Sequence, residues 1–203
     1  MSDTRIITVG RQFGSCGRAI AKRLAEYLNV KFYDKELIGL AAERGNISPE
    51  AAKEADQKPS SPWLYTVPGE ALNVGYTGVR SVNDTLFYAQ SEVIKELAEE
   101  SDCVIVGRCA DYVLRDHPNC TNIFIYSSME KKIEVIMDRF SLSEWDAKSL
   151  IKRTDKQRRY YYNYYTDRSW GEMENYHVCF DSGELGIDRT AEILCAMFEG
   201  WKS

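Results

Sequence analysis

The chain has neither a long apolar run nor the pattern of a secretion signal near its start. Its 203 residues contain no run of about 18 apolar residues, the length that a transmembrane helix requires. The first apolar run, at residues 6–9, is short and does not follow the basic stretch of a secretion signal. We therefore expect a cytoplasmic protein that does not bind membranes.

Histidine and closely spaced cysteine are also scarce. The two histidines, His117 and His177, stand far apart without metal-ligand spacing, and the six cysteines include no C-x-x-C pair. These spacings argue against a zinc site and against a disulfide framework. No serine or cysteine nucleophile with a partner histidine is suggested, so we expect both histidines to be structural.

The chain also lacks an excess of positive charge. Its net charge of −5 argues against a protein that binds a nucleic-acid polymer. Positive side chains nevertheless gather between residues 148 and 168, namely Lys148, Lys152, Arg153, Lys156, Arg158, Arg159 and Arg168. A local basic patch on an acidic protein suits a small anion, although a solvated helix face laced with salt bridges has the same pattern. We expect nucleotide-sized ligands and a monomer or homodimer.

Apolar runs alternate with amphipathic stretches, which is typical of an α/β fold with a parallel sheet flanked by helices. Strands are expected at residues 5–9, 30–33, 103–106, 122–126 and 176–180. Helices are expected at 18–28, 35–44, 83–100, 128–140, 143–165 and 187–198, with a short one capped by Ser48. Asp34 and Asn83 are the expected N-caps of two others. The proline- and glycine-bearing segment 56–82 is expected to be a functional loop.

A glycine-bearing loop, GRQFGSCGRA at residues 10–19, joins the first strand to the first helix. Such a junction directs backbone N–H groups at one point and suits phosphate. The standard loop, G-x-x-x-x-G-K-[ST], adds a lysine and a magnesium-binding hydroxyl, and this loop matches it in no register. We expect Arg18 to substitute for the lysine, since a guanidinium binds phosphate bidentately, and Ser15 is the nearest hydroxyl for a metal. A plain tight turn with a surface Arg18 is the alternative.

Three segments are informative in combination: ITVGRQFGSCGRAIAKRLAEYLNVKFYDKELI, VIVGRCADYVL and RTDKQRRYYYNYYTDRSWG. Together they resemble the cytidylate kinase-like family of P-loop proteins, from about Arg5 to Phe198. The resemblance implies a P-loop NTPase fold with about five parallel strands and a helical lid. It implies one domain over residues 1–203, with an acceptor-binding insertion at 45–84 and the lid at about 141–172. ATP and Mg²⁺ are the implied cofactors.

The resemblance also implies roles by position. The loop would bind the phosphates of ATP through Gly10, Gly14, Ser15, Cys16, Gly17 and Arg18. The acceptor site would include Asp34, Arg80, Asp84, Arg108 and Asp111. The catalytic group would be Arg18, Arg153, Asp155, Arg158 and Arg159, because fixed guanidinium groups stabilise the charge that spreads over a transferring phosphoryl group.

This chain departs from the family at two positions. Cys16 stands where the family usually has glycine, and Cys109 stands where cytidylate kinases have the aspartate of Gly-Arg-Asp. The leading hypothesis is transfer of the γ-phosphoryl group of ATP to a nucleoside monophosphate, CMP or dCMP first. Two others stay open: a kinase for another small acceptor, and a nucleotide-binding regulatory protein that no longer catalyses.

Overall fold

One five-stranded parallel sheet forms the centre of the molecule. The computed structural model describes residues 3–56 and 81–202. The strands are β1 (Ile6–Arg11), β2 (Lys31–Tyr33), β3 (Cys103–Val106), β4 (Cys120–Tyr126) and β5 (Val178–Asp181). They lie in the order β2-β3-β1-β4-β5, and every neighbouring pair is parallel. The sheet therefore confirms the α/β class and the number of strands expected from the sequence.

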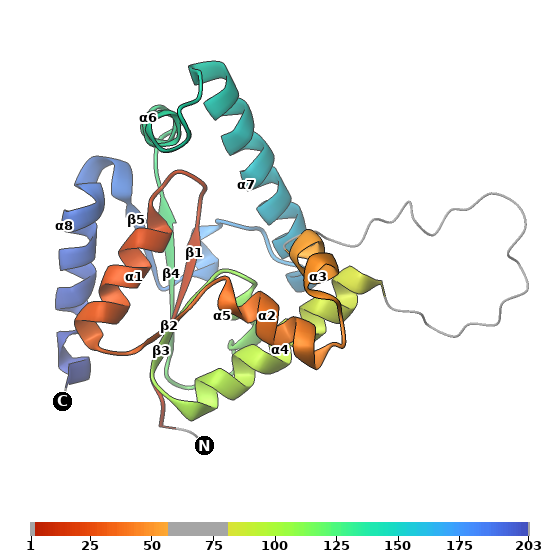
Figure 1. Ribbon diagram of the computed structural model, residues 1–203. Helices are drawn as coiled ribbons and strands as arrows, with labels where there is room; N and C mark the ends of the chain where they lie inside the picture. Colours follow the sequence, from red (N-terminus) through yellow and green to blue (C-terminus); the bar gives the residue numbers. More distant parts are fainter. Residues whose placement is uncertain (1–2, 57–80, 203) are drawn as a thin grey trace, which may run out of the picture.

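The central strands are apolar on both faces because helices cover both. Ile7 and Val9 of β1 pack with α1 (Gly17–Leu28) and α8 (Ser182–Met197). Ile6 lies on the opposite face and packs with α4 (Val82–Glu100) and α5 (Ala110–Val113). Successive side chains of a strand point to opposite faces, so one short strand serves both layers. Figure 1 shows α1 and α8 on one side of the sheet and α4 on the other.

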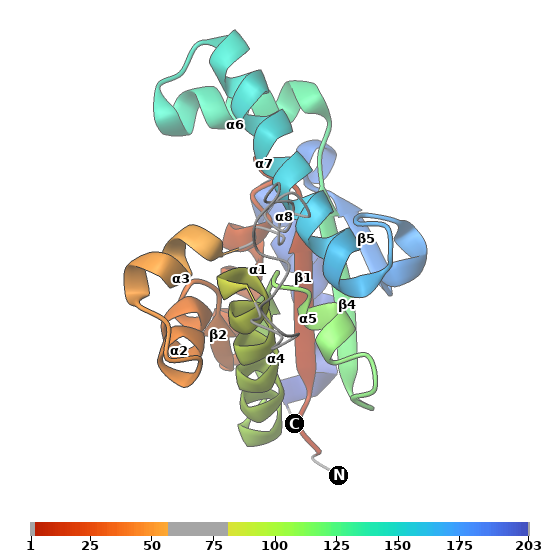
Figure 2. The ribbon, with the colours of Figure 1, turned by 90° about the vertical axis from the view of Figure 1, so that its right-hand side faces the viewer.

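The remaining helices form two extensions. Helices α2 (Glu36–Arg44) and α3 (Pro49–Ala55) pack on α4 through small residues such as Ala41, Ala52 and Ala89. Helices α6 (Met129–Phe140) and α7 (Glu144–Thr166) pack on each other through Ile136 and Ile151. This second pair projects beyond the carboxyl ends of the strands (Figures 1 and 2). Helix α7 lies within residues 141–172, the range expected for the lid, and α6 lies just before that range.

Several expected boundaries were wrong. Helix α2 is preceded by Lys35, because the carboxylate of Asp34 accepts hydrogen bonds from arginines and does not cap the helix. Helix α4 is capped by Ser81, whose hydroxyl accepts from the Asp84 N–H, and not by Asn83. Ser48 caps α3 as expected.

The C-terminal part also differs from expectation. Helix α8 begins at Ser182, and a break at Gly186 (φ 74°, ψ 167°) divides it. The last strand starts two residues later than expected, and the sequence pattern missed the short α5 and two 3₁₀ turns, Met173–Asn175 and Glu199–Lys202. The expected loop 56–82 and much of the expected insertion 45–84 lie outside the described residues. Within the described part of the chain, no helix combines the length and apolar character needed to cross a membrane.

Candidate functional site

The loop between β1 and α1 is closely packed at its glycines. Gly14 has φ +87°, and a Cβ there would lie 3.0 Å from the Cβ of Lys132. A Cβ on Gly17 would lie 2.7 Å from the Cβ of Arg11. The loop thus reaches α1 without steric conflict. The N–H groups of Ala19 and Ile20 donate to the Cys16 oxygen, whereas those of Gly17 and Arg18 have no acceptor within the helix. A helix start of this kind attracts anions.

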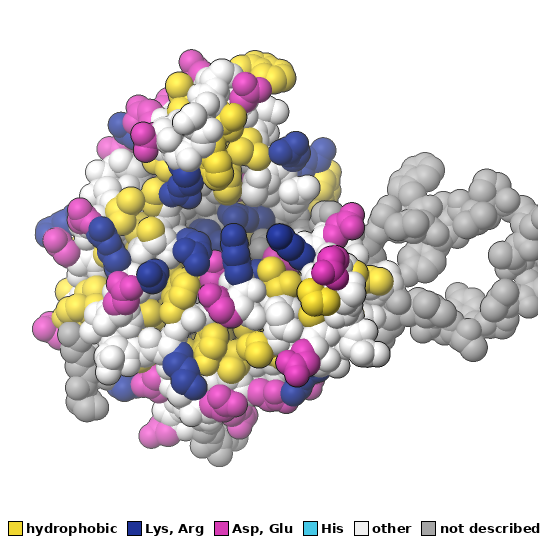
Figure 3. Space-filling model, viewed as in Figure 1, with side chains coloured by type: hydrophobic (Ala, Val, Ile, Leu, Met, Phe, Trp, Pro, Cys, Tyr) yellow, Lys and Arg dark blue, Asp and Glu magenta, His cyan; other side chains and the backbone are white. Residues whose placement is uncertain are grey.

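A cavity of about 390 Å³ lies in front of this loop. It contains five arginines, and its lining comes from the loop, the ends of β2 and β3, and α3, α6 and α7. The lining residues are Arg11, Gln12, Phe13, Gly14, Cys16, Gly17, Arg18, Ala19, Asp34, Lys35, Asp56, Arg108, Arg139, Phe140 and Arg158. Figure 3 shows lysine and arginine side chains gathered across the middle of this face.

Arg108 lies at the centre of a network of ion pairs in this cavity. Its guanidinium donates to Asp56 Oδ2 at 3.0 Å and to Asp34 Oδ1 at 3.4 Å, and it is almost fully buried. Within residues 3–56 and 81–202, its buried Nε has no hydrogen-bond partner. Gly107, Arg108 and Cys109 all have φ between 53° and 75°. Left-handed backbone at non-glycine residues costs energy and concentrates at functional sites.

Asp34 joins three arginines in this cavity. Its buried carboxylate accepts from Arg18 Nε at 2.5 Å, and Arg11 Nη2 lies 3.9 Å away. Burial acts to raise the pKa of Asp34. The hydrogen bond from Arg18 and the charges of Arg11 and Arg108 act in the opposite direction, and the pKa lies below its ordinary value. Asp34 is therefore an ionised group that holds the guanidinium groups in place.

Arg11 is a member of this site that the sequence analysis missed. Its side chain is buried, and its guanidinium lies against Gly107, where a Cβ would collide with it. Burial and the charges of Arg158 and Arg108 lower the pKa of Arg11. Its only sequence signal is a charged residue at the end of a buried strand, a position that also suits a surface residue.

The structure brings only part of the predicted lid cluster to the cavity. Arg158 donates to the backbone oxygen of Arg11 at 3.1 Å, and burial lowers its pKa. Asp155 accepts from the N–H of Phe13 at 2.7 Å. Arg153 and Arg159 are exposed, and neither lines the cavity in the part of the chain that is described. Asp155 and Arg158, three residues apart on α7, therefore contact the loop, whereas Arg153 and Arg159 do not line the cavity.

Gly10 and Ser15 were predicted to bind phosphate, but neither lines the cavity among the described residues. A Cβ on Gly10 would lie 2.8 Å from the Phe124 ring, so this glycine makes room for an aromatic side chain. The buried hydroxyl of Ser15 donates to the backbone oxygens of Gln12 and Ile125 and does not line the cavity. Ser15 is thus poorly placed to hold a metal ion there.

The other predicted acceptor residues lie to one side of the cavity. Asp111 is buried and accepts from the Tyr162 hydroxyl at 2.6 Å, and burial raises its pKa. It lines a separate hollow of about 20 Å³ next to Arg108 and Arg158. Asp84 accepts from the Tyr165 hydroxyl. Arg80 lies outside the described residues.

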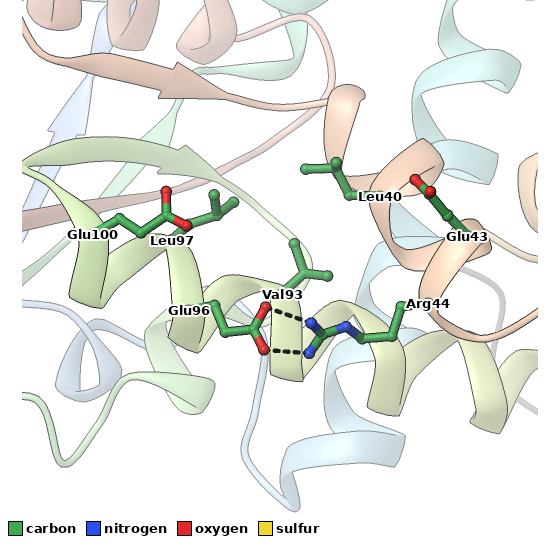
Figure 4. Close-up of a pocket in the computed structure, with 7 residues that line it drawn as sticks. All are labelled: Leu40, Glu43, Arg44, Val93, Glu96, Leu97 and Glu100. Atoms are coloured by element: carbon green, nitrogen blue, oxygen red, sulfur yellow. Dashed lines mark hydrogen bonds and ion pairs between the residues drawn. The ribbon is translucent and has the colours of Figure 1, made fainter.

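A second surface hollow, of about 320 Å³, lies between α2 and α4 and has the opposite character (Figure 4). Its apolar floor includes Leu40 and Leu97, and its one arginine, Arg44, is paired with Glu96 at 2.5 Å. Three glutamates line it, which disfavours phosphate. This hollow therefore suits phosphate less well than the cavity in front of the loop, which five arginines line.

Cys16 provides a direct test of strain in this loop. It precedes α1 in the left-handed conformation (φ 57°, ψ 12°). That conformation costs a non-glycine residue roughly 1–2 kcal/mol, partly offset by the greater freedom of glycine when unfolded. We expect Cys16→Gly to raise the free energy of unfolding by about 1 kcal/mol in urea denaturation. Cys16→Ala keeps the strain and is the control; equal midpoints for all three proteins would show that the loop is unstrained.

The sheet order, the loop after β1 and the helical pair above it define the P-loop kinase fold. The sequence model of the cytidylate kinase-like family matches residues 6–184, so the chain belongs to that family. Family and fold together support a nucleotide-dependent P-loop kinase. No curated protein matches the chain.

Solved structures have the same fold. An uncharacterized protein from Eubacterium ventriosum ATCC 27560 is similar with a TM-score of 0.72 and 27% identity, over 97% of this chain and 99% of that one. Shikimate kinase from Bacteroides thetaiotaomicron is similar with a TM-score of 0.56 and 14% identity, over 96% of this chain and 98% of that one. Shikimate kinase from Acinetobacter baumannii, in complex with shikimate, is similar with a TM-score of 0.50 and 14% identity, over 98% of this chain and 96% of that one. At such low identity the shikimate kinases bear on fold alone.

Proposed function

We propose that this protein transfers the γ-phosphoryl group of ATP to a nucleoside monophosphate, with CMP or dCMP as the first candidates. The observation that carries the proposal is the convergence of the loop, Arg108 and Arg158 on one cavity. Phosphoryl transfer needs mainly positioning and neutralisation of charge, and arginines from three separate elements supply both.

The loop and Arg18 form the donor side of the proposed site. The N–H groups that open α1 would hold phosphate oxygens, and Arg18 lines the cavity with its side chain 53% exposed. Its guanidinium already bonds to Asp34, which leaves its other nitrogens for phosphate. This arrangement agrees with Arg18 as a partial substitute for the missing lysine.

Arg108 and Arg158 form the acceptor side and the transfer side. The Nε of Arg108 is a buried donor without a partner among the described residues, and such a donor is costly unless a ligand or water satisfies it. An acceptor phosphate next to Arg108 would be in place to attack the γ-phosphorus as the bond to the ADP oxygen breaks. Arg158, held by the Arg11 backbone, would stabilise charge on the moving group.

Magnesium has carboxylates available in this cavity. The described residues contain no group of three His, Cys, Asp or Glu side chains that would bind a metal on its own. Magnesium bound with a nucleotide usually takes one or two carboxylates together with phosphates and waters. Asp34 and Asp56 both line the cavity. We expect Asp56 to bind the ion, because three arginines enclose Asp34. The ion would neutralise charge on the phosphates.

The test is ADP formation from Mg·ATP with CMP, dCMP, UMP, AMP, GMP or no acceptor. We expect turnover that depends on CMP or dCMP and falls at least tenfold in Arg18→Ala, which loses a charge-assisted phosphate contact. Arg23→Ala is the matched control, because Arg23 is half-exposed on the same helix and pairs with Asp188. Background rates with every nucleotide, or an equal loss in both variants, would contradict the proposal.

A kinase for a different small acceptor is the second candidate. Cys109 is buried among Phe87, Tyr161 and Tyr162, where the related cytidylate kinases have a carboxylate. The chain thus has apolar packing directly after Arg108, the residue whose counterpart approaches the acceptor in those enzymes. Binding of ATP without turnover on any nucleotide would favour this candidate, or a regulatory protein, over a nucleoside monophosphate kinase.

A further inference from the structure

The loop has no lysine of its own, but one from another element reaches it. Lys132 belongs to α6, and its side chain is only 6% exposed. Its ammonium donates to Gln12 Oε1 at 3.0 Å, and Gly14 lies against its Cα and Cβ. The absence of a side chain at Gly14 is what allows this approach. Helix α6 lies next to the loop in both ribbon views (Figures 1 and 2).

A carboxylate from the lid holds this lysine. Asp155 Oδ2 accepts from Lys132 Nζ at 3.3 Å, while Asp155 Oδ1 accepts from the N–H of Phe13 at 2.7 Å. One anionic group is therefore bound jointly by a loop amide and an ammonium. Phosphate loops bind phosphate oxygens with the same two kinds of donor.

We infer that Lys132 is the phosphate-binding lysine of this site, supplied from α6, and that Asp155 occupies its anion position until a donor nucleotide binds. The inference rests on the proposed function, since it concerns phosphates in the same cavity. Gln12, Phe13 and Gly14 line that cavity, so the position that Asp155 occupies is adjacent to it. A phosphate oxygen replaces the carboxylate at Phe13 and Lys132, and this exchange removes the Asp155 contact between α7 and the loop, while Arg158 keeps its hydrogen bond to the Arg11 backbone oxygen.

Burial distinguishes Lys132 from Arg18 as a replacement lysine. Arg18 is about half-exposed and bound to Asp34, whereas Lys132 is enclosed and has a single carboxylate partner among the described side chains. Removing a carboxylate from a buried ammonium is costly unless another anion replaces it. Phosphate is such an anion, so the exchange conserves charge at the loop.

The experiment is calorimetric binding of ATP and of inorganic triphosphate to the whole chain. We expect Lys132→Met to weaken both affinities roughly ten- to hundredfold, the loss of one charged hydrogen bond, and Lys132→Arg to restore part of them. Lys131→Met is the matched control, because Lys131 is an exposed neighbour paired with Glu134. We expect Asp155→Asn to bind both ligands several-fold more tightly than the parent. The double variant Lys132→Met with Asp155→Asn leaves no unpaired buried charge. It should not bind ATP or triphosphate more tightly than the parent.

If the contact between Lys132 and Asp155 is purely structural, the affinities should change in the opposite direction. If Asp155 only braces the loop, Asp155→Asn weakens binding, and that result overturns the inference. Equal affinities for Lys132→Met and the parent also overturn it. The proposed function fails separately, by absence of acceptor-dependent turnover in the parent. Loss of triphosphate binding in Lys132→Met would still support Lys132 in that case.

Discussion

Replacing Arg158 with alanine is expected to lower the turnover number of phosphoryl transfer by about a thousandfold. The guanidinium is half-buried at the cavity, fixed by the Arg11 backbone and placed over the Phe13 ring at 5.7 Å. A positive charge held in place acts mainly on the transition state, so the Michaelis constant for ATP should change far less. Steady-state rates of ADP formation over a range of ATP and acceptor concentrations measure both constants.

Lys156→Ala is the control for this prediction. Lys156 lies on the same helix, is exposed and packs near the Tyr160 ring, away from the cavity. Its removal should leave both constants close to those of the parent. A turnover number for Arg158→Ala within threefold of the parent would show that α7 does not supply the catalytic charge.

Asp34→Ala is expected to reduce the free energy of unfolding by about 3–5 kcal/mol, because removing one partner of a buried ion pair leaves uncompensated charge. The carboxylate is buried between Arg11, Arg18 and Arg108, so its loss leaves three cations facing one another. Urea denaturation at neutral pH measures the change. Asp188→Ala breaks an exposed pair with Arg23 and should have little effect.

The pH dependence of this effect has a definite sign. The pKa of Asp34 is lower in the folded protein than in the unfolded chain, so folding favours its ionised form. Its contribution is complete above the unfolded pKa of about 4 and is lost as the pH falls through the folded pKa. The stability difference between the parent and Asp34→Ala should therefore narrow below about pH 4. A constant difference would mean that Asp34 is not the titrating group.

The sheet and its order of elements could be predicted because buried parallel strands are almost continuously apolar. Cys103–Val106 is such a strand, fully buried in the structure. The loop after β1 was recognisable from its glycines and its place before a helix. These signals are local, and the structure bears them out. Helix caps were less predictable, since Asp34 can either cap a helix or bind arginines, and only the tertiary structure decides.

The cavity itself depends on contacts that no local pattern shows. Arg11 looks like a surface residue at the end of a strand, yet it is buried against Gly107. Lys132 is one of two adjacent lysines in the amphipathic helix α6, and only the packing of α6 on the loop distinguishes it. Arg153 belongs to the same charged run as Arg158 but has an exposed side chain. Spacing along a helix cannot decide which face meets the loop.

Transfer of label from γ-phosphoryl-labelled ATP to CMP tests the central claim most directly. Mg·ATP and CMP are incubated with the parent protein, and the products are separated. The account predicts label in CDP, formed in proportion to enzyme and absent without CMP. Label that remains in ATP, or appears only as inorganic phosphate whether or not CMP is present, would contradict phosphoryl transfer to this nucleotide.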